Sequence, residues 1–261
     1  MAIRDSRVPF ATTRRQLFIA GISAAAVLPN QGLAASRRYR AIAFDGFPIF
    51  DPRPVAAKAE ALLPGRGAVL MAAWRTRQFE YQWLRALAED YADFLHTTRD
   101  GLVFAARALN IELSPQTRDE LVGAYTELGV WSDIPSALKA LRESGLALSI
   151  VSNMTQPLLD DGLRRAGLSD AIDVVLSTDV VRSFKPSPRA YQLGVDALQL
   201  RREEILFVPF AGWDAAGAKA FGHPTYWVNR LHSPMEEWGP APDGIGRDMR
   251  DLLTFLGVAR V

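Results

Sequence analysis

The chain has 261 residues, of which 49% are hydrophobic and 23% are charged, and its formal net charge is +1. It contains no cysteine, which excludes disulfides, thiolate nucleophiles and thiolate metal sites. The three histidines are far apart and the basic residues alternate with acidic ones, so neither a histidine metal site nor a nucleic-acid partner is predicted. The length and composition fit one globular unit, or a core domain that carries a smaller insertion.

The N-terminal segment has its features in the order of an export signal. A twin-arginine pair at 14–15 precedes an uncharged apolar stretch, 17–28, which is shorter than the roughly 20 residues of a membrane span. Small residues follow, and cleavage is expected after Ala34 or Ala35. Residues 1–34 therefore resemble a Tat signal peptide, which predicts the Tat translocase as a partner and a periplasmic mature protein; a retained, uncleaved anchor is the alternative. Removing this segment takes away four arginines and one aspartate, which changes the net charge from +1 to −2.

A short apolar run from Ala41 to Phe44 predicts a buried parallel strand that ends in Asp45. Gly46 and Pro48 follow, which indicates a loop that turns sharply beside the carboxylate. Ligands bind at this edge of open α/β sheets, so Asp45 is a catalytic candidate. The plainer alternative is an aspartate that only caps or turns the loop.

The stretch that follows, residues 52–131, contains helical patterns and no strand pattern. A helical block directly after a first strand predicts an inserted all-α helical cap subdomain. Its helices are expected at 54–63, 68–87, 90–96, 101–109 and 116–128.

Strand and helix then alternate to the end of the chain. This pattern predicts the α/β fold class, with a doubly wound parallel sheet in a Rossmann-like core formed by residues 39–51 and 132–261. The further strands are expected at 146–151, 173–177, 205–208 and 225–228, and the helices at 135–143, 157–166, 188–198 and 215–220.

The candidate chemical groups all follow predicted strands. Asp45 ends the first strand and Ser152 and Asn153 end the second. Lys185 lies in the loop after the third strand, and Asp214 lies shortly after the fourth. Because the carboxyl ends of parallel strands meet at one edge of a sheet, these groups are expected to form a site.

At these positions the chain is similar to the haloacid dehalogenase (HAD) superfamily, and within it to the L-2-haloacid dehalogenases. The resemblance covers nearly everything after residue 39, and its motifs are specific in combination. Two stretches in the predicted cap narrow it to the dehalogenases, whereas Arg75 alone would be read as a solvated residue on a helix. The matching stretches are 44–45, 74–75, 79–84, 151–153, 185–191 and 212–219.

This resemblance implies a displacement at carbon in two steps. Asp45 would attack the halogen-bearing carbon and form an ester. Arg75 and Asn153 would receive the halide. Lys185 would offset the charges of Asp45 and Asp214, and Asp214 would orient or deprotonate the water that hydrolyses the ester.

The other site residues implied by the resemblance bind the substrate. Ser152, with the backbone N–H groups after the nucleophile, would hold the substrate carboxylate. Tyr191 would join the polar cluster by a hydrogen bond. Phe47, Phe94 and Trp213 would wall the pocket and exclude water, although Trp213 could equally be ordinary core.

A phosphatase is the poorer interpretation of these motifs. The phosphatases of the superfamily carry a second acid two residues after the nucleophile, where this chain has Phe47, and hold Mg²⁺ with acids in the last motif, where only Asp214 remains. A halide leaves without a proton, so an aromatic residue at position 47 is compatible with dehalogenation. We therefore expect no metal and no cofactor, a small 2-halocarboxylate as substrate, and either a monomer or a homodimer.

Four positions depart from the dehalogenase pattern. The family has a Gly-Thr pair where this chain has Pro48 and Ile49, and Ser and Asn where it has Pro209 and Ala211. Each polar contact that acts in the transition state is worth about 10²–10³-fold in rate. We therefore expect slow hydrolysis of the ester, and the alternative is a catalytically impaired protein that binds a small carboxylate.

Overall fold

A computed structural model describes residues 38–259 of the chain. The predicted export signal of residues 1–34 lies outside the described residues and stays a prediction. Within the described range, none of the helices is both long and apolar enough to cross a lipid bilayer.

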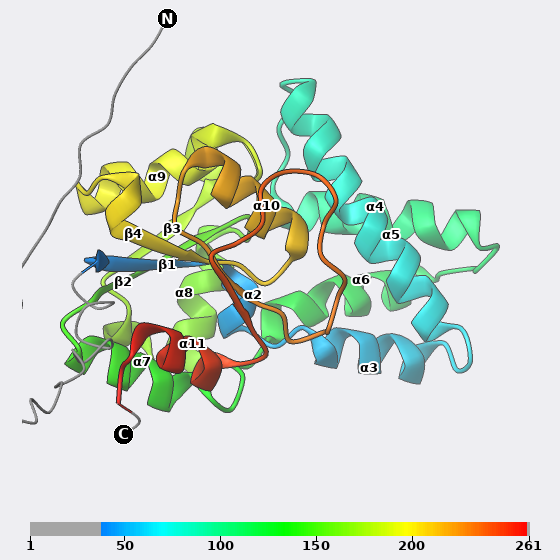
Figure 1. Ribbon diagram of the computed structural model, residues 1–261. Coiled ribbons are helices and arrows are strands. Elements are labelled where there is room, and N and C mark those ends of the chain that lie inside the picture. The colour runs from blue at the N-terminus through cyan, green and yellow to red at the C-terminus, as the bar shows by residue number, and fades with distance from the viewer. Residues whose placement is uncertain (1–37, 260–261) are drawn as a thin grey trace, which may run out of the picture. The chain divides into compact units, whose positions relative to one another are not determined.

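Four short parallel strands form the main sheet (Figure 1). β1 (Ala41–Phe44) lies between β2 (Ala147–Ser152) and β4 (Ile205–Val208), and β3 (Val174–Ser177) pairs with the other edge of β2. This order places the strand that precedes Asp45 inside the sheet, with the carboxyl ends of β2 and β4 on either side of it. The predicted α/β fold with a parallel sheet is confirmed.

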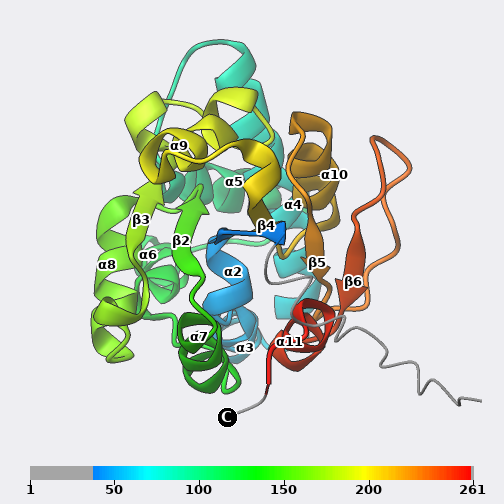
Figure 2. The same ribbon diagram turned by 60° about the vertical axis from the view of Figure 1, so that its left-hand side comes forward.

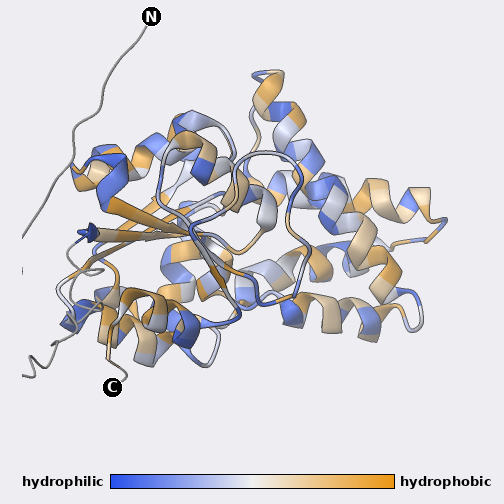
Figure 3. Ribbon diagram, viewed as in Figure 1, coloured by the Kyte–Doolittle hydropathy of each residue, from blue (hydrophilic) through white to orange (hydrophobic). Residues whose placement is uncertain are grey.

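The two faces of the sheet are covered by different helices (Figure 2). Alternate residues of β1 belong to different cores: Ile42 packs in the larger one and Ala43 in the smaller one. The strands are mostly apolar, as expected for parallel strands that are buried on both faces (Figure 3). The larger core includes α7 (Ile134–Glu143), α8 (Gln156–Arg165) and α11 (Met249–Leu256), and the smaller one includes α9 (Pro188–Leu198) and α10 (Gly212–Phe221).

The predicted last strand forms β5 (Tyr226–Val228), but it is not a full member of the main sheet. It pairs in parallel with β6 (Gly244–Gly246), which the sequence patterns did not reveal. β5 stays beside β4 through two hydrogen bonds, from Phe207 N to Pro224 O at 2.8 Å and from Val228 N to Pro209 O at 3.1 Å. Because proline has no N–H, the ladder between the two strands cannot continue at either proline.

The segment between β1 and β2 is helical, as its pattern predicts. Its helices lie to one side of the main sheet in Figure 1. Whether they form a cap separate from the core stays a prediction. They are α3 (Arg53–Leu62), α4 (Gly67–Leu87), α5 (Phe94–Ala108), α6 (Pro115–Gly123) and the 3-10 helix η1 (Ala124–Glu127); further 3-10 helices in the chain are η2 (Ser169–Ala171), η3 (Thr178–Val181) and η4 (Arg202–Glu204).

The two helices predicted at 90–96 and 101–109 are wrong, because α5 is one continuous helix. It begins after Asp93, whose carboxylate caps it by accepting the His96 N–H at 2.8 Å. Gly101 does not interrupt it. A β-carbon on Gly101 would lie 3.0 Å from the backbone nitrogen of Gln78, so the glycine allows α4 and α5 to pack closely.

Candidate active site

Asp45 lies where β1 ends and a short helix begins. The loop predicted at Gly46 and Pro48 is instead the helix α2 (Gly46–Ile49), and the Asp45 carboxylate caps it by accepting the Phe47 N–H at 3.2 Å. A side chain at Gly46 would clash, since its β-carbon would lie 2.7 Å from Ser152 Oγ. Asp45 is therefore a cap and also a carboxylate at the edge of the sheet, fixed in direction by the helix that it caps.

A buried lysine joins two carboxylates at this edge. Lys185 Nζ lies 2.6 Å from Asp45 Oδ1 and 2.6 Å from Asp214 Oδ2, and its side chain is only 1% exposed. Tyr191 donates its hydroxyl to Asp214 Oδ1 at 2.7 Å. These four residues, all predicted, therefore form one hydrogen-bonded chain from β1 to α9 and α10.

Burial and these contacts set the protonation states of Lys185, Asp214 and Tyr191. Burial lowers the pKa of Lys185, but attraction to Asp214 and Asp45 outweighs it and holds the pKa above its ordinary value. Burial raises the pKa of Asp214 to about 6, with Lys185 opposing this rise and Asp45 adding to it. Burial and the neighbouring Asp214 raise the pKa of Tyr191. Near pH 7, therefore, Lys185 and Tyr191 hold their protons and most Asp214 is ionised.

Asp45 also lines a small, mostly apolar cavity of about 20 Å³. This is room for about one water molecule. Lys185, Tyr191 and Asp214 do not line it and connect to it through Asp45. The other predicted site residues all line it, namely Phe47, Arg75, Phe94, Ser152, Asn153 and Trp213, together with Phe79, Met154, Phe210 and Ala211, to which the sequence assigned no place in the pocket.

Arg75 of α4 supplies the positive charge of the cavity. Burial lowers the pKa of its guanidinium, with Tyr125 and Asp45 opposing this effect. Its contacts are aromatic: the guanidinium carbon lies 5.5 Å from the ring centroid of Phe210 and 5.9 Å from that of Phe79. Among residues 38–259, no acidic side chain forms an ion pair with it. A mostly buried cation without an acidic partner is well suited to bind an anion.

Gln82 of α4 holds Asn153 in place, a role that was not predicted from the sequence. The Asn153 amide donates to Gln82 Oε1 at 2.9 Å, and its own oxygen accepts the backbone N–H of Lys185 at 2.9 Å. The signal for Gln82 was its spacing, since Trp74, Gln78 and Gln82 occur every fourth residue and are all buried. A polar residue on such a buried stripe needs a hydrogen-bond partner.

The departures from the dehalogenase pattern remain apolar in the fold. Ile49 is fully buried at the end of α2. Ala211 lines the cavity. Pro209 does not line it, and its carbonyl oxygen accepts the Val228 N–H. These three side chains therefore offer no hydroxyl or amide group to a water molecule beside Asp45.

The charged groups at this edge are two carboxylates and one ammonium. The ammonium of Lys185 lies between Asp45 and Asp214. In the part of the chain that the structure describes, no group of three or more histidine, aspartate or glutamate side chains is arranged to hold a metal.

A larger hollow of about 260 Å³ adjoins the cavity. The two share four lining residues, Phe47, Arg75, Phe79 and Phe210, and the hollow is also mostly apolar. Arg75 lines both the hollow and the cavity, whereas Asp45 lines only the cavity.

The fold and site define a Rossmann-like α/β protein with a carboxylate centre at the end of its first strand. Residues 18–222 match the family described as haloacid dehalogenase-like hydrolase. Over 221 residues the chain is 42% identical to (S)-2-haloacid dehalogenase of Pseudomonas sp. (strain YL), which covers 84% of this chain and 95% of that protein. The chain therefore belongs to the haloacid dehalogenase-like hydrolase family.

Two further relatives support this assignment. Haloacetate dehalogenase H-2 of Moraxella sp. (strain B) is 34% identical over 208 residues, which cover 79% of this chain and 93% of that protein. The structure of L-2-haloacid dehalogenase from Xanthobacter autotrophicus with chloropropionic acid covalently bound has a TM-score of 0.76 and 32% identity, and the match covers 84% of this chain and 98% of that one.

Proposed function

We propose that the protein is a hydrolytic dehalogenase of short (S)-2-haloalkanoic acids that works through an ester on Asp45 without a metal ion. One observation carries this proposal: Asp45 lines the same small apolar cavity as Arg75, a mostly buried cation that has no ion-pair partner among residues 38–259. A carboxylate nucleophile, an anion site and exclusion of water are what displacement of halide requires. The covalently bound chloropropionic acid in the Xanthobacter enzyme supports an ester intermediate here.

In the first step, an Asp45 carboxylate oxygen attacks the carbon that bears the halogen. The new C–O bond forms as the C–halogen bond breaks, and the halide leaves with the electron pair of that bond toward Arg75 and Asn153. The substrate carboxylate is held by Ser152 and nearby backbone N–H groups. The carbon is attacked from the side opposite the halogen, so its configuration inverts.

In the second step, water adds to the ester carbonyl of Asp45 and gives its proton to Asp214. The bond from that carbonyl carbon to the alkyl oxygen then breaks, and the alkyl oxygen takes up the proton from Asp214 and leaves as the hydroxyl of the 2-hydroxy acid. The carboxyl group formed on Asp45 releases the second proton of the water to solvent, which restores the carboxylate. Lys185 bridges Asp45 and Asp214 before the reaction and is left with Asp214 once Asp45 is esterified, and Tyr191 fixes Asp214. The net products are a 2-hydroxy acid, halide and one proton.

A catalytically impaired protein that binds a small carboxylate is the second candidate. It is favoured by the apolar residues Ile49, Pro209 and Ala211, which leave the hydrolytic water with few polar neighbours. If these residues only slow the second step, the ester on Asp45 should accumulate.

Rapid-quench measurement of halide from L-2-chloropropionate and monochloroacetate, with and without EDTA, separates these alternatives. Dehalogenation with slow hydrolysis gives a burst of halide about equal to the enzyme concentration and then a slow steady state. Mass spectrometry of quenched enzyme should then find a carboxyalkyl adduct on the peptide that contains Asp45. No halide would favour the impaired protein, linear release without adduct would refute slow hydrolysis, and phosphate release from a phosphoester that EDTA abolishes would support a phosphatase.

Export to the periplasm remains part of the proposal, supported by the order of arginine pair, apolar stretch and small residues in 1–34. Replacing both arginines, Arg14→Lys with Arg15→Lys, should leave the precursor in the cytoplasm. Unchanged periplasmic delivery would contradict a Tat signal. Sedimentation of the mature protein would decide whether it is a monomer or a homodimer.

A further inference from the structure

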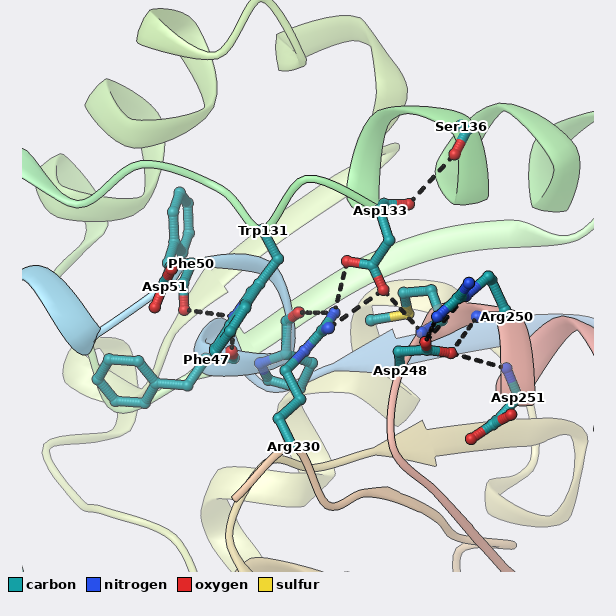
Figure 4. A network of polar contacts seen from close by, with 12 residues as sticks. Phe47, Phe50, Asp51, Trp131, Asp133, Ser136, Arg230, Asp248, Arg250 and Asp251 are labelled. Atoms are coloured by element: carbon teal, nitrogen blue, oxygen red, sulfur yellow. Dashed lines mark hydrogen bonds and ion pairs between the residues drawn. The ribbon is translucent and has the colours of Figure 1, made fainter. Parts of the chain in front are cut away.

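The short helix that follows the nucleophile needs donors for its carbonyl groups. The carbonyls in the last turn of a helix have no partners within the helix, and α2 has only four residues. Trp131 supplies three of these contacts, and the two made by its indole are drawn in Figure 4. Its indole Nε1 donates to Phe47 O at 3.0 Å and to Phe50 O at 3.1 Å, and its backbone N–H donates to Ile49 O at 3.0 Å.

Arg230 supplies the contact to the remaining carbonyl. Its guanidinium donates to Pro48 O at 3.2 Å and lies 4.5 Å from the centroid of the Trp131 ring. The side chain is 7% exposed and forms two hydrogen bonds to the Asp133 carboxylate, at 3.1 and 2.9 Å. A cation at the carbonyl end of a helix is also favoured by the helix dipole.

This cluster of Trp131, Arg230 and Asp133 is itself anchored at a second point. Asp133 accepts the backbone N–H of Met249 at 2.9 Å, which ties the cluster to the start of α11. Beside the cluster, the chain leaves and re-enters the core through an antiparallel bridge between Phe50 and Val130. The cluster therefore joins α2, the point where the inserted helices connect, and the C-terminal helix.

We propose that Trp131 and Arg230 are positioning residues for the nucleophile, which rests on the proposed role of Asp45 in dehalogenation. They hold α2 at its carbonyl end, and Asp45 caps the other end of the same helix. Their loss would leave buried carbonyl oxygens without donors, so α2 would shift to reach other partners. A shift of about 1 Å in a reacting group lowers the rate by up to about 10²-fold.

The test is Arg230→Met, which removes the donor and the charge and retains most of the side-chain volume. Arg250→Met is the control, because Arg250 also forms an ion pair with an aspartate, Asp248, but is exposed and makes no contact with α2 within the described residues. We expect Arg230→Met to lower the rate constant of the halide burst at least about 10-fold with KM nearly unchanged. In Arg250→Met both the burst rate constant and KM should equal those of the unmodified protein.

The amplitude of the burst separates positioning from folding. A residue that only stabilises the fold would lower the amplitude and the melting temperature, but each folded molecule would react at the normal rate constant. Arg230→Lys should recover part of the rate, because a lysine can still reach the Pro48 carbonyl with a positive charge. Should Arg230→Met not fold, Trp131→Phe, which removes only the indole donor, is measured in the same way.

A normal burst rate constant in folded Arg230→Met or Trp131→Phe would overturn the positioning role. This outcome differs from failure of the proposed function, in which the unmodified protein itself releases no halide.

Discussion

Asp45 has two neighbourhoods of opposite character. One is the cavity, where aromatic rings surround Arg75 and no acid within the described residues pairs with that cation. The other is the chain of Lys185, Asp214 and Tyr191, in which every group is buried and hydrogen-bonded to the next. In the first neighbourhood a positive charge is available to bind an anionic ligand, whereas in the second the positive and negative charges already pair with one another.

This difference matches the two steps of the proposed reaction. A departing halide needs a cation that is free to receive it, and in a medium of low dielectric constant that attraction is strong. Hydrolysis needs a base held in one place, which the contacts of Asp214 with Lys185 and Tyr191 provide. Damage to one neighbourhood should therefore impair one step and leave the other, and variants can test this separation.

The largest effect is expected at the residue that both neighbourhoods share. Asp45→Asn should abolish halide release, because an amide is a far weaker nucleophile than a carboxylate. The fold should persist, since asparagine is as good a helix cap as aspartate and α2 can still form. Halide assays with circular dichroism check both points, and retained multiple turnover by the variant would refute Asp45 as the nucleophile.

The second effect isolates the hydrolytic neighbourhood. Asp214→Asn should keep the halide burst but slow the steady state by about 10²-fold or more, because the general base is lost. The adduct on the Asp45 peptide should become the main species in quenched samples. Asp196→Asn on α9 is the control, since that exposed carboxylate accepts a hydrogen bond from Gln192 alone among the described residues. Equal loss of burst and steady state would show that the neighbourhoods do not act separately.

The third effect isolates the cavity. Arg75→Met should lower the rate constant of the burst by about 10²-fold, the scale for removing a charge that stabilises a transition state. Hydrolysis of the ester, once formed, should continue at its normal rate. Arg77→Met on the same helix is the control, because Arg77 lies over the Phe104 ring at 3.8 Å and does not line the cavity. A normal burst rate constant in Arg75→Met would show that Arg75 does not bind the departing halide.

The sequence predicted the polar groups around Asp45 that follow strands, namely Ser152, Asn153, Lys185 and Asp214. Asp45 and Ser152-Asn153 follow apolar runs, and parallel strands bring such ends together. Arg75 required the resemblance to a family, since an arginine on a helix has no pattern that separates a buried cation from a solvated one. The roles of these residues still depend on the experiments above.

What the sequence did not predict are contacts made to the backbone. The hydrogen bonds from Trp131 and Arg230 to α2 cross 84 and 182 positions of the chain and end on carbonyl groups, which every residue has. No side-chain pattern marks such an acceptor. At Gly101 the sequence pattern gave a wrong prediction. Glycine is typical of helix ends, but Gly101 lies inside α5, where it allows close packing against α4.

The smallest effect, and the one that needs no mutation, is the dependence of the second step on pH. Burial raises the pKa of Asp214 to about 6, whereas the contacting Lys185 and Tyr191 have raised pKa values and stay protonated. A base acts only when ionised. In the ester Asp45 carries no charge and no longer raises the pKa of Asp214, so steady-state turnover should be constant at neutral pH and fall about tenfold per pH unit at a pH somewhat below 6. The burst should not follow this curve, because the first step does not use Asp214 as a base. Stopped-flow halide detection from pH 4.5 to 8 would measure both phases, and a burst that falls together with the steady state would show that the titrating group also acts in the first step.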